Sequence, residues 1–184
     1  WGYSLVSILL RRSIIWSANK LPPQDQYNMF GFDGTDDYID FGNDASLQLT
    51  DNFTICVWIE TSSLDSNDHV FGKWSSTNNQ RSYFLQERND GRFRFVVSKN
   101  GGATTYDVLG STSSISANTE YFVCCTVEGT TLKIFVDGVE YASDTSMPSA
   151  GIHNSTENLV VGGTATNSVD YEGSAANFFV YNRV

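Results

Sequence analysis

Short apolar runs separated by turn residues recur along this chain from residue 28 onward, and they constrain its fold more than any other feature. Several runs alternate apolar and polar residues, as in Arg92-Phe93-Arg94-Phe95, which is typical of a strand with one buried face. Residues 53–59 are apolar on both faces, as a central strand is. No segment after residue 28 carries an apolar stripe with helical spacing, so the sequence predicts an all-β protein.

Turn signals divide these runs at spacings typical of β-sandwiches. Asp137-Gly138 interrupts residues 126–143 and is a dipeptide that suits a two-residue type I′ hairpin. Glu128-Gly129 and Asn89-Asp90-Gly91 separate two further pairs of runs. About a dozen strand candidates result, which predicts a sandwich or jelly roll.

The charge divides the chain into two unequal parts. The whole chain has 21 acidic and 11 basic residues and a net charge of −10, whereas residues 1–20 carry +3 and no acid. The acidic excess excludes a nucleic-acid binder and disfavours anionic membranes, because both partners attract Lys and Arg. Pro22-Pro23 reads as a stiff linker. We therefore expect an N-terminal arm over residues 1–27 and one domain over residues 28–184.

The apolar front end of the arm, residues 1–16, is interrupted by two arginines. It is too short and too charged for a membrane-spanning helix, and its positive charge follows the apolar run, unlike that of a signal peptide. A segment this apolar should bury itself, either on its own sandwich or on a partner subunit. The residues expected to make these contacts are Trp1, Leu5, Leu9, Arg11, Arg12 and Trp16.

The three cysteines do not form a recognisable disulfide framework. Their odd number leaves at least one thiol without an intrachain partner, and the neighbours Cys124 and Cys125 point to opposite faces of a strand. We interpret all three as small buried apolar side chains. This interpretation permits folding in a reducing compartment.

Seven motifs follow one another in an order that matches a known family. They occupy residues 32–42, 53–59, 72–74, 91–97, 120–143, 158–163 and 171–183. Together they resemble the laminin-G-like, concanavalin A-like jelly-roll family. The resemblance implies a two-sheet antiparallel jelly-roll sandwich, and it implies that Trp58 is the buried strand tryptophan of the family.

The residues argue against catalysis. Related glucanases carry carboxylates in the spacing Glu-x-Asp-x-(x)-Glu on one strand, and no strand candidate here has it. His69 and His153 have no Ser or Cys partner arrangement and no zinc spacing. We expect a protein that is not an enzyme and requires no cofactor.

Calcium is the one metal that the resemblance implies, at the rim of the sandwich. Asp33 and Asp36 in one loop, and Asp65 and Asp68 in another, offer the hard oxygen ligands that calcium takes. Acid-rich loops of an acidic protein are also commonly solvated and hold no ion.

Two places in the chain present polar groups suited to a partner. Trp74 is followed by Asn78, Asn79 and Arg81, which would set a stacking ring beside amides and a cation, unless Trp74 ends a core strand. Tyr106 is a second candidate ring. The basic residues of one predicted hairpin form either a solvated face or a contact for an acidic neighbour; they are Arg88, Arg92, Arg94 and Lys99.

Two functions from different classes follow. The first is an interaction module on a virion or cell surface, bound through the arm to capsid, tail or surface subunits, since such domains occur in phage and surface proteins of this family. The second is a secreted carbohydrate-binding module of a larger enzyme or adhesin, which would bind glycans. Both predict a location on a virion, on a cell surface or outside the cell.

Overall fold

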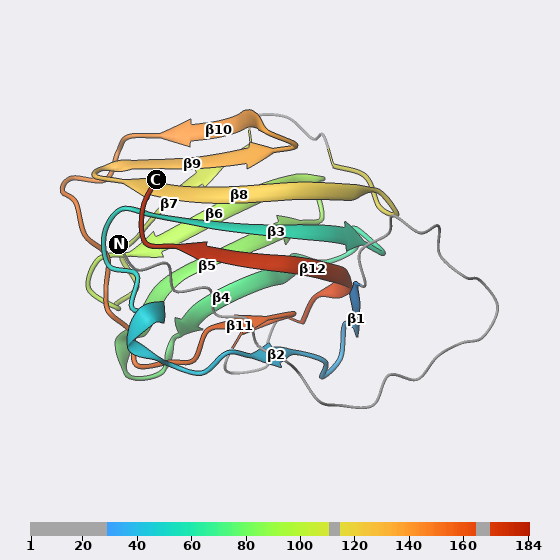
Figure 1. Ribbon diagram of the computed structural model, residues 1–184, viewed down its shortest axis with the longest axis horizontal. Coiled ribbons are helices and arrows are strands. Elements are labelled where there is room, and N and C mark those ends of the chain that lie inside the picture. Colours follow the sequence, from blue (N-terminus) through green and yellow to red (C-terminus); the bar gives the residue numbers. More distant parts are fainter. Residues whose placement is uncertain (1–28, 111–114, 165–169) are drawn as a thin grey trace, which may run out of the picture.

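A computed structural model of the chain describes residues 29–110, 115–164 and 170–184. Within these residues the chain forms twelve strands and two short 3-10 turns, in two antiparallel sheets packed face to face (Figure 1). The all-β prediction and the two-sheet jelly-roll sandwich are confirmed. The residues proposed for the arm, Trp1 to Trp16, lie outside the described residues.

The first sheet, sheet A, lies toward the viewer in Figure 1. Every neighbouring pair in it is antiparallel. Its strands, in spatial order, are β1 (Phe30–Asp33), β12 (Glu172–Tyr181), β3 (Phe53–Thr61), β8 (Glu120–Glu128), β9 (Thr131–Val136) and β10 (Val139–Asp144).

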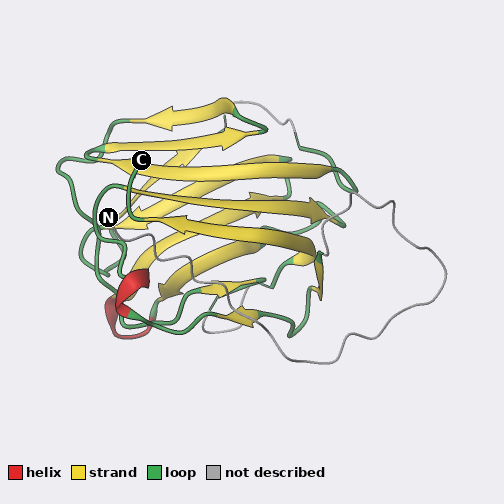
Figure 2. Ribbon diagram, viewed as in Figure 1, coloured by secondary structure: helices red, strands yellow, loops and turns green. Residues whose placement is uncertain are grey.

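The second sheet, sheet B, lies behind it. Its strands, in spatial order, are β2 (Ile39–Asp40), β11 (Val160–Val161), β4 (His69–Ser75), β5 (Gln80–Arg88), β6 (Arg92–Ser98) and β7 (Thr105–Leu109). The 3-10 turns η1 (Ala45–Leu47) and η2 (Thr77–Asn79) are drawn red at one end of the sandwich in Figure 2.

The core follows from the period-two pattern of the strands. In β3, Phe53, Ile55, Val57 and Ile59 have no exposed surface, so these alternate positions face sheet B. Tyr83 and Leu85 of β5, with Phe93 and Phe95 of β6, are equally buried from the opposite sheet. Burial of each such side chain stabilises the fold by roughly 1.5–3 kcal/mol, which explains why the two apolar faces meet.

The predicted hairpin turn is confirmed. Asp137 and Gly138 have φ of 51° and 80°, as a type I′ turn requires at both central positions, and Val139 pairs with Val136 across it.

Trp58 is not a core tryptophan. It alternates with the buried positions of β3, so it faces outward from sheet A, where it is half-buried and its ring lies 5.1 Å from that of Phe122. The family resemblance was misleading at this residue because a strand with two apolar faces does not reveal which face is covered.

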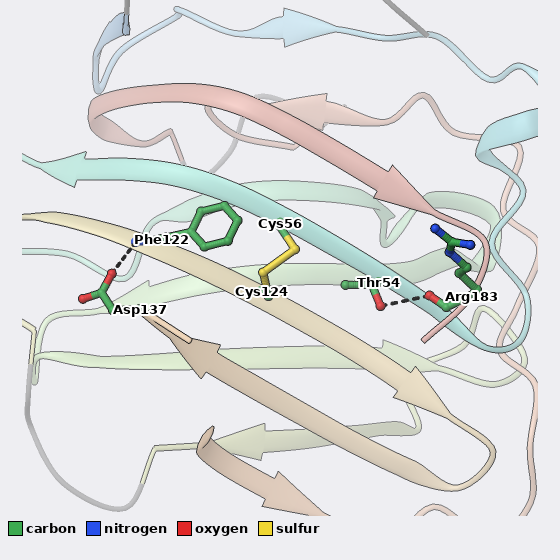
Figure 3. The surroundings of a disulfide bond; sticks show 6 residues. All are labelled: Thr54, Cys56, Phe122, Cys124, Asp137 and Arg183. Carbon is green, nitrogen blue, oxygen red and sulfur yellow. Dashed lines mark hydrogen bonds between the residues drawn. A yellow bond between two sulfur atoms is a disulfide. The ribbon is translucent and has the colours of Figure 1, made fainter. Parts of the chain in front are cut away.

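The interpretation of three unpaired cysteines is wrong for two of them. Cys56 of β3 and Cys124 of β8 are direct cross-strand neighbours, with Cα atoms 4.1 Å apart, and form a disulfide (Figure 3). Cys125 points into the core as a free thiol, as predicted for at least one cysteine, and its burial raises its pKa. Disulfides persist in oxidising compartments, so the bond favours a protein that works outside the cytosol.

Among the residues that the structure describes, no helix has the length and apolar character needed to cross a membrane.

Candidate ligand-binding site

The hairpin between β4 and β5 brings four of the five predicted ligand residues to one end of sheet B. Trp74 and Arg81 are Cα partners next to a β-bulge, and Asn78 and Asn79 lie in the connecting turn η2. Both asparagines have positive φ, 53° and 56°, which Asn tolerates better than most residues. Their side chains are exposed.

Trp74 lies on the outer side of sheet B rather than in the core. Its ring is half-buried, stands edge-on to Phe84 at 4.6 Å, and lies 6.0 Å from the guanidinium carbon of Arg81. Phe84 in turn contacts His69 at 4.2 Å between ring centroids, so Trp74 ends a row of three rings. The alternative that Trp74 merely ends a core strand does not describe this position, because one part of the ring remains accessible.

Two loops hold the hairpin end in place. Gly101 accepts hydrogen bonds from the backbone N–H and the guanidinium of Arg81, at 3.3 and 3.4 Å. Gly101 itself has φ of +77°, and a Cβ atom there would lie 1.8 Å from the carbonyl oxygen of Asn79, so only glycine fits. On the other side, the Ser155 hydroxyl donates to the backbone carbonyl of Gln80 at 2.8 Å. The Thr156 N–H donates to the side-chain oxygen of Gln80 at 2.7 Å.

This arrangement can hold a saccharide ring. The C–H face of a pyranose packs on an aromatic ring such as Trp74, and the amides of Asn78 and Asn79 can donate to and accept from its hydroxyls. Arg81 adds a planar donor that suits a carboxylate. The loops anchored at Gly101 and Ser155 reduce the ordering cost of binding, because the hairpin end is already fixed.

Tyr106, the fifth predicted residue, is not part of this group. It lies in β7 and is partly buried against the core, on the opposite side of sheet B from Trp74. Gly101 and Ser155, which support the site, were not predicted, since only their position beside the hairpin gives them a role.

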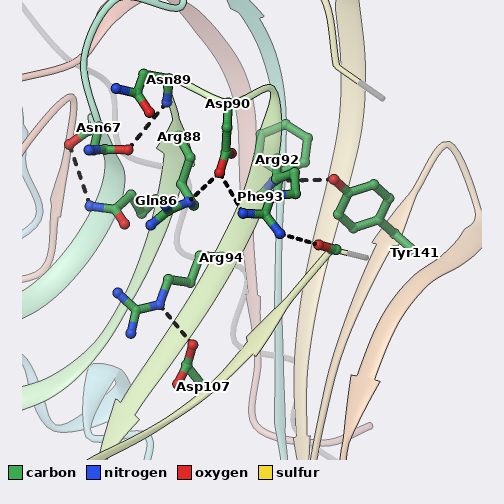
Figure 4. A network of polar contacts seen from close by, with 11 residues as sticks. Asn67, Gln86, Arg88, Asn89, Asp90, Arg92, Phe93, Arg94, Asp107 and Tyr141 are labelled. Carbon is green, nitrogen blue, oxygen red and sulfur yellow. Dashed lines mark hydrogen bonds and ion pairs between the residues drawn. The ribbon is translucent and has the colours of Figure 1, made fainter. Parts of the chain in front are cut away.

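The three arginines of the β5–β6 hairpin each pair with a nearby carboxylate (Figure 4). Arg88 and Arg92 pair with Asp90 at 3.2 and 2.5 Å, and the bond from Arg92 is the main reason that the pKa of Asp90 falls to about 2. Arg94 pairs with Asp107 at 2.8 Å. The ammonium of Lys99 donates to three backbone carbonyls, those of Ser149, Ala150 and Gly151. These contacts favour a structural role over an open basic patch.

Comparison with models of known protein families shows which family this fold belongs to. A family model described as the concanavalin A-like lectin/glucanases superfamily matches residues 33–184. The chain belongs to this superfamily. No curated protein matches the chain significantly.

Three solved structures of similar fold show what superfamily members look like at this distance. The CBM40 of the Ruminococcus gnavus IT-sialidase, bound to α2,3-sialyllactose, has a TM-score of 0.67 at 16% identity, over 85% of this chain and 90% of that one. Domains LG4-5 of the mouse laminin α1 chain have a TM-score of 0.62 at 17% identity, and the match covers 84% of this chain and 41% of that one. The heptameric SAP-like pentraxin of Limulus polyphemus has a TM-score of 0.56 at 14% identity, and the match covers 84% of this chain and 75% of that one. These likenesses show the fold.

The two acidic loops expected to bind calcium both lie near Asp170, a residue that was not predicted to take part. Asp170 interacts electrostatically with Asp36 and Asp33, and also with Asp68. Burial is the main cause that raises the pKa of both Asp170 and Asp68. Even so, the described part of the chain contains no group of three or more His, Cys, Asp or Glu side chains arranged to hold a metal ion.

We expect EDTA to leave the melting temperature within about 1 °C of its value in calcium. Two of the four carboxylates already accept hydrogen bonds within their own loops, since Asp33 accepts from the Thr35 N–H at 2.9 Å and Asp68 from the Ser66 hydroxyl. Scanning calorimetry in EDTA and in excess calcium tests this. A rise of several degrees with calcium would instead show an ion bound to the folded state.

Proposed function

We propose that this chain is a non-catalytic carbohydrate-binding module that holds a saccharide against Trp74. The observation that carries the proposal is the hairpin end, where a partly exposed indole lies beside the guanidinium of Arg81 and the connecting turn carries two exposed asparagines. The sialyllactose bound by the R. gnavus CBM40 supports a saccharide as the ligand class. Arg81 favours a saccharide that carries a carboxylate.

The disulfide supports a location outside the cytosol, in a secreted or surface-attached protein, because disulfides persist in oxidising compartments. It also removes the argument that the cysteines permit folding in a reducing compartment, because that argument took all three cysteines as unpaired. Attachment to capsid, tail or surface subunits through residues 1–27 stays a prediction. It is tested by deleting residues 1–23 and asking whether the soluble domain still joins its assembly.

Trp74→Ala is expected to weaken saccharide binding at least tenfold, which corresponds to about 1.4 kcal/mol of lost ring contact. A glycan array first identifies the saccharide, with sialylated and neutral sugars side by side. Titration calorimetry then compares wild type, Trp74→Ala and, as a matched control, Tyr181→Ala, which removes an exposed ring from the other sheet. Equal loss in both variants, or a blank array, would contradict the proposal.

A further inference from the structure

The outer face of sheet A carries a continuous strip of apolar side chains. Cross-strand pairing sets Phe179 beside Cys56, Cys56 beside Cys124, and Cys124 beside Phe135, in one row across four strands. Trp58 and Phe122 flank the row on one side and Tyr181 on the other. Phe179 and Tyr181 are 39% and 42% exposed. The sheet A strip therefore consists of Cys56, Trp58, Phe122, Cys124, Phe135, Phe179 and Tyr181.

The strip lies on the side of sheet A that faces away from sheet B. The disulfide lies at its centre with Phe122 nearby (Figure 3). Rings from separate strands contact one another here, with Phe179 and Tyr181 stacked at 6.3 Å. Phe179 and Tyr181 are exposed, and most of the other strip residues are half-buried. Apolar side chains gathered in this way on an outer face usually mark a contact surface.

One end of the strip carries an unbalanced pair of acids. Glu60 and Glu120 are direct cross-strand partners just beyond Trp58 and Phe122, and both face outward by the alternation of their strands. Like charges directly opposite each other on a sheet are destabilising. Among the ion pairs of the described residues, neither carboxylate has a basic partner. This end of the strip is therefore suited to a cationic segment.

The described chain begins at the same end. Ser174, the Cα partner of Glu60 on β12, donates its hydroxyl hydrogen bond to the sulfur of Met29 at 3.6 Å. The residues before Met29 are the apolar, basic segment of the sequence, in which Arg11 and Arg12 interrupt the run of residues 1–16.

We infer that residues 1–16 of the same chain cover the sheet A strip, with Arg11 and Arg12 beside Glu60 and Glu120. Apolar side chains of the segment match the rings of the strip, and its positive charge matches the acidic pair. From Met29, the intervening residues reach roughly 40 Å when extended, whereas the row of four strands is about 15 Å wide. A short tether also gives an effective concentration near millimolar, which favours the chain's own segment over another copy's.

Photo-crosslinking of the full chain tests this contact. A benzophenone amino acid replaces Leu9, and crosslinked peptides are identified by mass spectrometry. We expect crosslinks to residues 53–61, 120–128 or 172–181, within a monomer, at a yield constant over about a hundredfold range of protein concentration. Crosslinks to the strands of sheet B, crosslinks between two copies, or no crosslinks would overturn the inference.

Charge variants test the acidic end separately. Glu60→Lys with Glu120→Lys is expected to lower the crosslinking yield at least threefold, and adding Arg11→Glu with Arg12→Glu is expected to restore it. The matched control is Glu128→Lys, an exposed carboxylate at the opposite end of β8, which should leave the yield unchanged. A yield unaffected by any of these charges would show that Glu60 and Glu120 do not contact the segment.

Discussion

Replacing both Cys56 and Cys124 by Ala is expected to lower the free energy of unfolding by about 2–4 kcal/mol. The bond joins residues 68 positions apart and closes a long loop in the unfolded chain, so its removal returns conformational freedom to that state. Both sulfurs lie on the outer face of sheet A, so alanine leaves no cavity in the core. Urea unfolding monitored by tryptophan fluorescence measures the change.

Reductant supplies the control for this prediction. It should destabilise the wild type by a similar amount and leave the double alanine variant unaffected. Under non-reducing conditions the unfolded wild type should titrate as one free thiol, that of Cys125. Three free thiols, or a wild type insensitive to reductant, would show that the disulfide does not form.

Glu87→Gln is expected to stabilise the protein by about 2–4 kcal/mol at pH 9 and to change its stability little at pH 4.5. Glu87 has no exposed surface, and burial, with smaller contributions from the carboxylates of Asp68 and Asp65, raises its pKa to about 8. Thr61 donates to one carboxyl oxygen at 2.5 Å, and the other has no partner among the described residues.

The direction follows from proton binding. Between about pH 4.5 and pH 8 the unfolded carboxyl has lost its proton while the folded one retains it, so folding stability falls as pH rises. Glutamine removes this dependence. Urea unfolding at several pH values gives the difference between variant and wild type, with Glu128→Gln as an exposed control expected to differ by less than about 0.5 kcal/mol throughout. A Glu87→Gln difference that is constant with pH would contradict the assignment.

The regular part of the fold could be predicted from the sequence because each strand carries its own local signal. Residues 53–59 reappear within β3, and Asp137-Gly138 forms the turn that its residue types favour. The β4–β5 site was predictable for a related reason. Trp74, Asn78, Asn79 and Arg81 lie within eight positions of one another, so a single hairpin suffices to bring them together.

The features that were missed depend on contacts between distant segments. The Cys56–Cys124 bond requires the register of β3 against β8, which no local pattern reveals. Asp170 approaches Asp33 and Asp36 only in the folded protein. The burial of Glu87 had a detectable signal, since it continues the alternate core positions Tyr83 and Leu85, but its charge and its place near a turn favoured the surface.

The position of the bound saccharide tests the proposed function most directly. In two-dimensional ¹H–¹⁵N NMR spectra, adding the saccharide selected on the array should shift the indole N–H signal of Trp74, assigned by its loss in Trp74→Phe, together with the amides of Asn78, Asn79 and Arg81. The signals of Trp58 and Tyr181 should stay in place. Shifts confined to sheet A, with Trp74 unchanged, would contradict a carbohydrate site at the end of the β4–β5 hairpin.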